Sequence, residues 1–219
     1  MIESFRNDLW PGYKTSAGIE PALLAQFHPL EEALAAMGVV VWPMVELEAD
    51  DALASAAALA ADDPRVEKVS IWSPDKDLAQ CVRGERVVQV DRRGKKILDE
   101  AAVRAKFGVP PALIPDYLAL VGDAADGYPG LPGIGAVGAA RLLNRYGPIE
   151  TIPDESLRGQ RDRALLFKTL AILRADAPLF GDVEELRWQG PAATFGATAE
   201  RMGAGRLVER LRKVAAAAR

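Results

Sequence analysis

Aspartate and glutamate side chains gather in three short segments of this 219-residue chain. The segments are Glu48-Ala49-Asp50-Asp51, Asp75-Lys76-Asp77, and the stretch that holds Asp123 and Asp126. Residues three apart share one face of a helix, and residues two apart in an extended segment point the same way. Each segment therefore brings two carboxylates together.

Crowded carboxylates repel one another, and either bound protons or a divalent cation compensates for that repulsion. Ligand sets made only of oxygen favour a hard ion such as Mg²⁺ or Mn²⁺. Two such ions roughly 4 Å apart would clamp the attacking and leaving oxygens of a phosphodiester. Any one of the three segments is equally typical of a solvated helix start or an acidic turn, but the three together indicate a metal site.

The composition excludes other kinds of site. One cysteine (Cys81) cannot form an internal disulfide, and one cysteine with one histidine cannot build a His/Cys zinc site. A histidine-dependent nucleophile could use only His28, which we expect to be a partly buried or surface residue of a helix. No apolar run approaches the roughly 20 residues that cross a bilayer, and no signal segment is evident, so we expect a cytoplasmic location.

The charge is unevenly distributed along the chain. Residues 1–130 have 13 Lys+Arg and 21 Asp+Glu, whereas residues 131–219 have 14 and 10. The first part is therefore acidic and the second is mildly basic, which suits a metal cluster beside a surface that faces phosphates. Solvated helix faces would give the same asymmetry.

The apolar pattern predicts strands and helices that would position the carboxylates. We expect an α/β domain over 1–110 and a helical part over 111–219, because strands alternate with helices only in the first part. The predicted elements are a helix over 21–37 ended by Gly38, a strand over Val39–Trp42, a helix over 48–61, a strand over Val66–Trp72, paired strands over Val87–Val90 and Lys96–Leu98 around Arg92-Arg93-Gly94, and helices after Asp99. Ligands bind outside the carboxyl ends of parallel strands. The first two acidic segments follow the two predicted buried strands, so we expect them to meet at one edge.

A glycine-rich string, Gly130-Leu131-Pro132-Gly133-Ile134-Gly135, precedes a predicted helix over 136–146. Glycines let the backbone turn sharply and approach a ligand closely. Exposed amides at a helix N-terminus suit a phosphate, although a plain helix–helix turn would use the same residues.

Taken in order, these motifs resemble the 5′ nuclease (flap endonuclease) family, which includes the 5′-3′ exonuclease domain of bacterial DNA polymerase I. The resemblance rests on the first acidic segment, Ser73–Gln80 and Val121–Gly138, together with Phe5-Arg6 and Tyr13-Lys14. It implies a parallel-sheet nuclease core of the PIN-like 5′ nuclease fold, with an arch segment near 5–30. It also implies a helix–three-turn–helix DNA-binding element near 118–146.

The resemblance also implies roles for individual residues. Arg6 and Lys14 would steer the scissile phosphate as catalytic residues, while Trp10 and Tyr13 would either stack on unpaired bases or anchor the loop. The expected metal ligands, acting directly or through water, are Glu48, Asp50, Asp51, Asp75, Asp77, Asp123 and Asp126. The expected DNA contacts are Gly130, Gly133, Gly135 and Arg141, with a potassium ion held by backbone carbonyls at the glycine hairpin. Val137 stands where relatives usually carry a lysine, and Arg141 or Arg145 would compensate.

One departure from the family pattern concerns the first residues. Family members begin with two strands that each supply an aspartate before the Phe-Arg segment, and no residue here matches either aspartate. We therefore expect that the chain begins at an internal start codon or was cut.

The sequence thus predicts a Mg²⁺- or Mn²⁺-dependent 5′-3′ exonuclease or flap endonuclease that uses two ions and acts on DNA with a 5′ end or 5′ flap. Neither a membrane nor a protein partner is expected. The alternatives are a catalytically impaired relative that binds branched DNA without cutting it, and a metal-dependent ribonuclease of a related fold.

Overall fold

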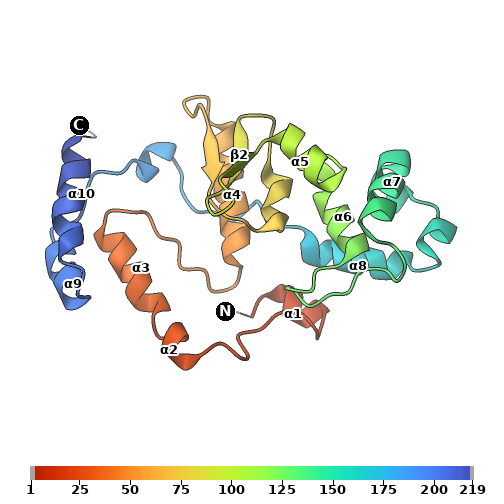
Figure 1. Cartoon of the computed structure of the whole chain (residues 1–219), viewed down its shortest axis with the longest axis horizontal. Coiled ribbons are helices and arrows are strands. Elements are labelled where there is room, and N and C mark those ends of the chain that lie inside the picture. Colours follow the sequence, from red (N-terminus) through yellow and green to blue (C-terminus); the bar gives the residue numbers. More distant parts are fainter. Residues whose placement is uncertain (1–2, 218–219) are drawn as a thin grey trace. The chain divides into compact units, whose positions relative to one another are not determined.

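The computed structural model describes residues 3–217, whose contacts divide them into two compact units (Figure 1). The first unit comprises the residues through Thr15 and residues Met44–Leu179, and the second comprises Ser16–Pro43 and the residues from Phe180 onward. The predicted domain division near residue 110 stays a prediction.

A three-stranded sheet lies in the first unit, in the order β1-β2-β3. Strand β1 (Val69–Ile71) runs parallel to β2 (Val87–Asp91), with Val69 opposite Val87. Strand β3 (Lys96–Leu98) is antiparallel to β2, as expected for the predicted hairpin. The structure is thus mixed α/β with a small sheet and a helical C-terminal part.

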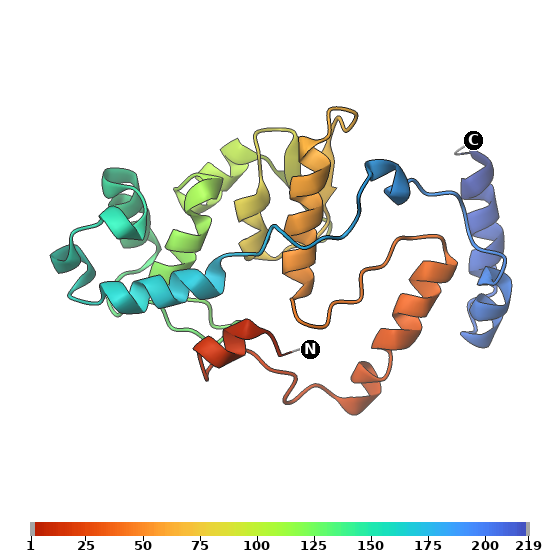
Figure 2. The same cartoon turned by 180° about the vertical axis from the view of Figure 1, so that it is seen from behind.

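Helix α4 (Ala49–Asp62) packs against β1 and the 3₁₀ helix η1 (Lys76–Cys81), and Figure 2 shows it lying along one face of the sheet. Its small side chains allow this close approach: Ala57 and Ala61 form a buried cluster with residues of β1, β2 and η1. Glu48 is the N-cap of α4 and Asp75 that of η1. The packing of these elements therefore determines where both acidic segments lie.

Helices follow the sheet along the rest of the first unit and share its largest apolar core. Helix α6 packs against both α7 and α8. Helix α1 (Phe5–Leu9) also contacts α8. The helical elements after the sheet are α5 (Glu100–Phe107), η2 (Pro111–Leu113), α6 (Ile114–Val121), α7 (Ala136–Tyr146), η3 (Ile149–Thr151), η4 (Asp154–Leu157) and α8 (Arg161–Ala171).

The second unit is helical, and a small cluster that includes Ala36, Phe195 and Ala199 is buried within it. His28, in this unit, is exposed and pairs with Glu31. No helix within residues 3–217 is long and apolar enough to cross a membrane. The elements of this unit are α2 (Pro21–Leu24), α3 (Phe27–Ala36), η5 (Val183–Leu186), α9 (Phe195–Arg201) and α10 (Arg206–Ala217).

The predicted strand over Val39–Trp42 is wrong. Gly38 takes a left-handed conformation (φ +83°), and the backbone N–H of Val39 donates to Leu34 O, which ends α3. Val39 and Val40 are 44% and 42% exposed. The apolar run therefore follows a helix cap and forms no ladder. The first acidic segment reaches the site through the start of α4, and only the second follows a strand.

Candidate metal centre

The three acidic segments converge in the first unit. Glu48 and Asp50 lie at the start of α4, Asp75 and Asp77 at the start of η1, and the third segment in the loop after α6. Asp123 begins that loop, where its backbone pairs with Tyr128 and its side chain accepts from the Ala125 N–H. This turn holds Asp126 three residues further on.

Asp77, Asp123 and Asp126 form the centre of the cluster. Their carboxylate oxygens lie within 4.8 Å of one another, and all three residues are buried. Oδ1 of Asp77 has no hydrogen-bond partner within the described part of the chain. Burial, followed by the charges of Asp126, Asp75 and Asp123, raises the pKa of Asp77 to about 9. Burial and neighbouring negative charges disfavour an ionised carboxylate, and a bound cation would offset both effects. The unpartnered oxygen of Asp77 is therefore suited to bind a cation.

Two lysines supply positive charge at the cluster. Nζ of Lys14 lies 2.8 Å from Oε2 of Glu48 and 2.9 Å from Oδ1 of Asp126. Nζ of Lys76 lies 2.8 Å from Oδ2 of Asp123. Although burial alone lowers the pKa of Lys14, its hydrogen bonds to Glu48 and Asp126 raise that pKa above the ordinary lysine value. Lys14 therefore stays charged at neutral pH.

Negative charge still exceeds positive charge at this site. Burial, followed by the charge of the more exposed Asp75, raises the pKa of Asp50 to about 6. Six carboxylates face the two ammonium groups, so full ionisation leaves an excess of four negative charges. They are those of Glu48, Asp50, Asp75, Asp77, Asp123 and Asp126. The donor set is oxygen alone, which fits hard divalent cations.

Arg6 and Asp51 bind each other beside the cluster, where Nη1 of Arg6 also lies 3.2 Å from Oε1 of Glu48. The guanidinium of Arg6 donates to both carboxylate oxygens of Asp51, at 2.9 and 2.8 Å, and also to Leu170 O and Ile172 O. The side chains of Arg6 and Asp51 are 1% and 0% exposed. Burial alone would raise the pKa of Asp51, but hydrogen bonds from Arg6 and from the Arg174 N–H lower it. The structure thus places both residues in a buried ion pair, and their predicted roles with phosphate and metal stay predictions.

Trp10 and Tyr13 anchor the loop that holds Lys14. The Trp10 ring packs edge-on against Phe167 with centroids 5.2 Å apart, and its Nε1–H donates to Gly127 O. Tyr13 is only 4% exposed. In the structure, these two aromatic side chains anchor the loop.

The glycine-rich string forms the connection between α6 and α7, and Gly135 is the N-cap of α7. Gly130 packs on the end of α6: a Cβ there would lie 2.4 Å from the Gly122 nitrogen, so no side chain fits. Gly133, Gly135 and Arg141 are exposed, and Val137 is 83% exposed. The string is separate in sequence from the acidic segments, and its DNA contacts stay predictions.

Three site residues were missing from the predicted set. Lys76 lies between the two aspartates of its own segment, so its position in the sequence was a usable signal. Tyr128 is buried against the cluster and its hydroxyl has no partner among residues 3–217; only its position after Gly127 could have indicated it. Arg158, whose Nη2 lies 3.4 Å from Gly133 O, gave no local signal because the two residues are far apart in sequence.

Two protein-family models together match most of the chain. Residues 2–108 match the 5′-3′ exonuclease N-terminal resolvase-like domain, and residues 109–194 match the 5′-3′ exonuclease C-terminal SAM fold.

Individual relatives agree with these matches. The chain is 34% identical over 201 residues to the flap endonuclease Xni of Edwardsiella ictaluri, covering 87% of this chain and 78% of that protein. It is 33% identical over 202 residues to DNA polymerase I of Bacillus caldotenax, covering 85% of this chain but only 23% of the polymerase. The chain thus spans less than a quarter of that polymerase.

The fold also matches a solved structure, that of the flap endonuclease of bacteriophage T5 crystallised as a pseudo-enzyme-product complex with DNA and metal ions. The TM-score is 0.61 at 16% identity, and the match covers 96% of this chain and 79% of that chain.

Proposed function

This chain belongs to the 5′-3′ exonuclease family, and on that premise we propose that it hydrolyses DNA phosphodiesters at a 5′ end or 5′ flap with the help of divalent cations. The observation that carries the proposal is the convergence of three acidic segments on the buried Asp77, Asp123 and Asp126. A DNA substrate in a bacterial cell would place the protein in the cytoplasm.

Divalent cations at such a site lower the pKa of water and stabilise the charge that develops on a phosphodiester. The carboxylates that converge and face one another would hold Mg²⁺ or Mn²⁺, whose positive charge would balance the excess of formal negative charge at the site. The assigned residues are Glu48, Asp50, Asp75, Asp77, Asp123 and Asp126.

Lys14 contributes a charge that the substrate can use. Its ammonium already lies between Glu48 and Asp126 at the edge of the cluster, with 21% of its side chain exposed. From there it offers a cation to a phosphate and offsets negative charge in the transition state. Arg6 and Asp51 have positioning roles in this proposal: their ion pair fixes the start of α4 and hence the orientation of Glu48 and Asp50.

The duplex would bind at the connection between α6 and α7, which in this proposal forms the helix–three-turn–helix element of a PIN-like nuclease. The amides at the start of α7 and the side chain of Arg141 are available to phosphates there. A potassium ion at the carbonyls of this hairpin belongs to the same proposal.

The test is cleavage of a labelled 5′-flap duplex in the presence of Mn²⁺ or Mg²⁺. We expect the chain to release the flap, and Asp75→Asn and Asp77→Asn to lose the activity while retaining the fold by circular dichroism. Asp62→Asn is the matched control, because it removes a carboxylate of α4 that lies far from the cluster and pairs with Arg83.

Tight binding of the duplex with no cleavage by the unmodified chain would contradict a nuclease and indicate a branched-DNA binding module. Cleavage confined to an RNA strand would indicate the ribonuclease alternative.

A further inference from the structure

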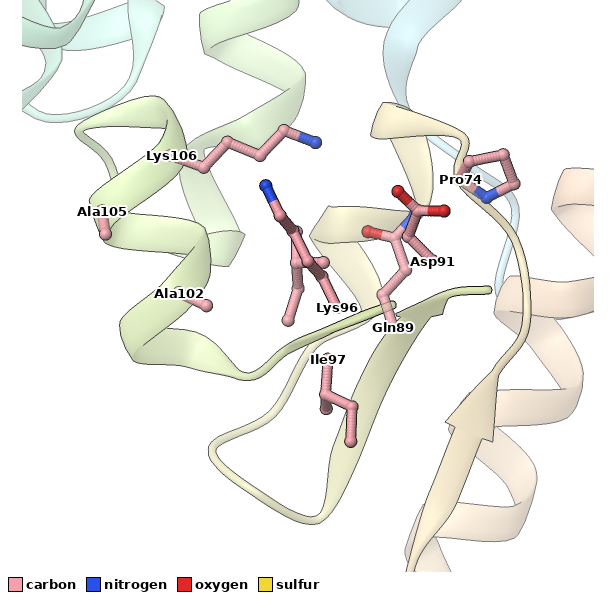
Figure 3. Close-up of a pocket in the computed structure, with 9 residues that line it drawn as sticks. Pro74, Gln89, Asp91, Lys96, Ile97, Ala102, Ala105 and Lys106 are labelled. Carbon is pink, nitrogen blue, oxygen red and sulfur yellow. The ribbon is translucent and has the colours of Figure 1, made fainter. Parts of the chain in front are cut away.

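A cavity lies outside the acidic cluster, between the β2–β3 hairpin and α5 (Figure 3). Its volume is about 550 Å³, within the range of small-molecule sites. One part of its wall is apolar and includes Pro74, Ile97 and Ala102, and the other is polar. The polar residues are Gln89, Asp91, Lys96 and Lys106.

Two ammonium groups extend toward the same side of this cavity. Figure 3 shows the side chains of Lys96 of β3 and Lys106 of α5 both extending into the space between the hairpin and α5. Across residues 3–217, neither ammonium has a carboxylate within 4.0 Å. The turn of the same hairpin adds Arg92, Arg93 and Lys95. These two ammonium groups, one of which also lies 4.8 Å from the centroid of the Phe107 ring, favour an anion, and lysine is a common phosphate ligand.

The opposite side of the cavity offers hydrogen-bond acceptors. Gln89 is 1% exposed, and its Nε2 donates to Ser73 O and Asp75 O, which leaves Oε1 buried without a partner in the described part of the chain. Asp91, two residues along β2, lies on the same face of the strand. One of its oxygens accepts from the Gly94 N–H. A ligand with N–H donors would satisfy these acceptors.

We propose that this cavity binds a nucleoside 5′-monophosphate. The phosphate lies between Lys96 and Lys106. The base packs on Ala102 and on Leu98, which shares a face of the hairpin with Lys96, and its N–H groups point toward Asp91 and Gln89. Inorganic phosphate would fill only the cationic side, and an organic acid without N–H groups would leave the acceptors unused. A nucleotide supplies an anion, an apolar face and N–H donors in one molecule.

The cavity is connected to the acidic cluster through Gln89. Its amide holds the backbone carbonyls of Ser73 and Asp75, in the segment that leads into Asp77. A nucleotide bound to Gln89 would thus contact the side chain whose hydrogen bonds hold the Ser73–Asp75 segment in place. The binding site itself does not depend on the proposed nuclease activity.

The test is calorimetric titration of the full chain in EDTA, which keeps divalent cations from recruiting nucleotides to the acidic cluster. The ligands are dAMP, dGMP, dCMP, TMP, deoxyguanosine and inorganic phosphate. We expect at least one monophosphate to bind at least tenfold more tightly than deoxyguanosine and inorganic phosphate. The double variant Lys96→Met/Lys106→Met should lose at least tenfold in affinity.

Two control variants separate this site from others. Arg93→Met removes a cation of the same hairpin outside the cavity, and Asp77→Asn alters the acidic cluster; each should change the affinity less than threefold. No saturable binding, equal binding of inorganic phosphate, or an equal loss in Arg93→Met or Asp77→Asn would overturn the proposal.

Discussion

Replacing Arg6 by methionine should destabilise the protein strongly, because Arg6 is half of a buried ion pair. Its guanidinium binds both oxygens of Asp51 and two backbone carbonyls at the C-terminal end of α8. The variant keeps an apolar side chain in place but leaves the carboxylate of Asp51, which is 0% exposed, without its cation.

The magnitude follows from this burial. Breaking a buried pair by removing one partner typically costs about 3–5 kcal/mol, because the remaining charge is desolvated and uncompensated. Domains of this kind have about 5–15 kcal/mol of stability, so Arg6→Met removes a large share. The surface pair of Arg83 with Asp62 offers the matched control: Arg83→Met should cost at most about 1 kcal/mol.

The same pair makes the loss depend on pH. Because the folded-state pKa of Asp51 is lowered, its ionised form contributes stability that is fully present above about pH 4, its unfolded value. That contribution disappears as the pH falls through the lower folded pKa. The difference between wild type and Arg6→Met should therefore shrink as the pH falls, because the buried, unpaired Asp51 of the variant takes up a proton above pH 4 and the paired Asp51 of the wild type does so only below it.

The measurement is urea unfolding of both proteins followed by tryptophan fluorescence, with flap cleavage assayed below the variant's midpoint. The double variant Arg6→Met/Asp51→Leu should lose less stability than the two single variants together. A loss under about 1 kcal/mol would refute the reasoning from burial. Unchanged stability together with abolished cleavage would instead indicate that Arg6 contacts the substrate.

Three further outcomes are expected. Mn²⁺ at about 100 times its Kd should stabilise the protein by about 2.7 kcal/mol in a thermal-shift titration, and Asp77→Asn should remove most of that gain; an unchanged gain would contradict the ion site. In EDTA, the free energy of unfolding should fall as the pH rises from about 4, where unfolded Asp77 ionises, to about 9, where the folded residue ionises. An equal fall for Asp77→Asn over this pH range, measured by urea unfolding, would contradict this. Gly130→Ala should cost more than about 2 kcal/mol in the same unfolding assay, because its φ is +69° and its Cβ would meet the Gly122 backbone; a smaller cost would show that the turn can rearrange.

Local signals allowed much of the fold to be predicted. The acidic start of α4 and the hairpin around Arg92-Arg93-Gly94 follow from residues within one element, and the structure has both. The strand predicted over Val39–Trp42 is wrong because an apolar run alone does not reveal that Gly38 and Val39 form the C-terminal cap of α3.

Long-range contacts were harder to predict. The acidic segments meet as expected. The first one, however, is brought there by the packing of α4 and not by the end of a strand. The pairing of Arg6 with Asp51 joins residues 45 apart, and no spacing rule connects them. The orphaned hydroxyl of Tyr128 and the acceptor of Gln89 arise only once distant elements enclose them.

The contact between Lys14 and Glu48 also closes a loop of the chain. The chain leaves the first unit after Thr15 and returns to it at Met44, so these two residues flank the whole segment Ser16–Pro43 at its points of attachment. An ion bound by the carboxylate of Glu48 would compete with the ammonium of Lys14 for that carboxylate and would weaken this contact. We therefore expect the occupancy of the acidic cluster and the tethering of segment Ser16–Pro43 to be thermodynamically linked, so that each reports on the other.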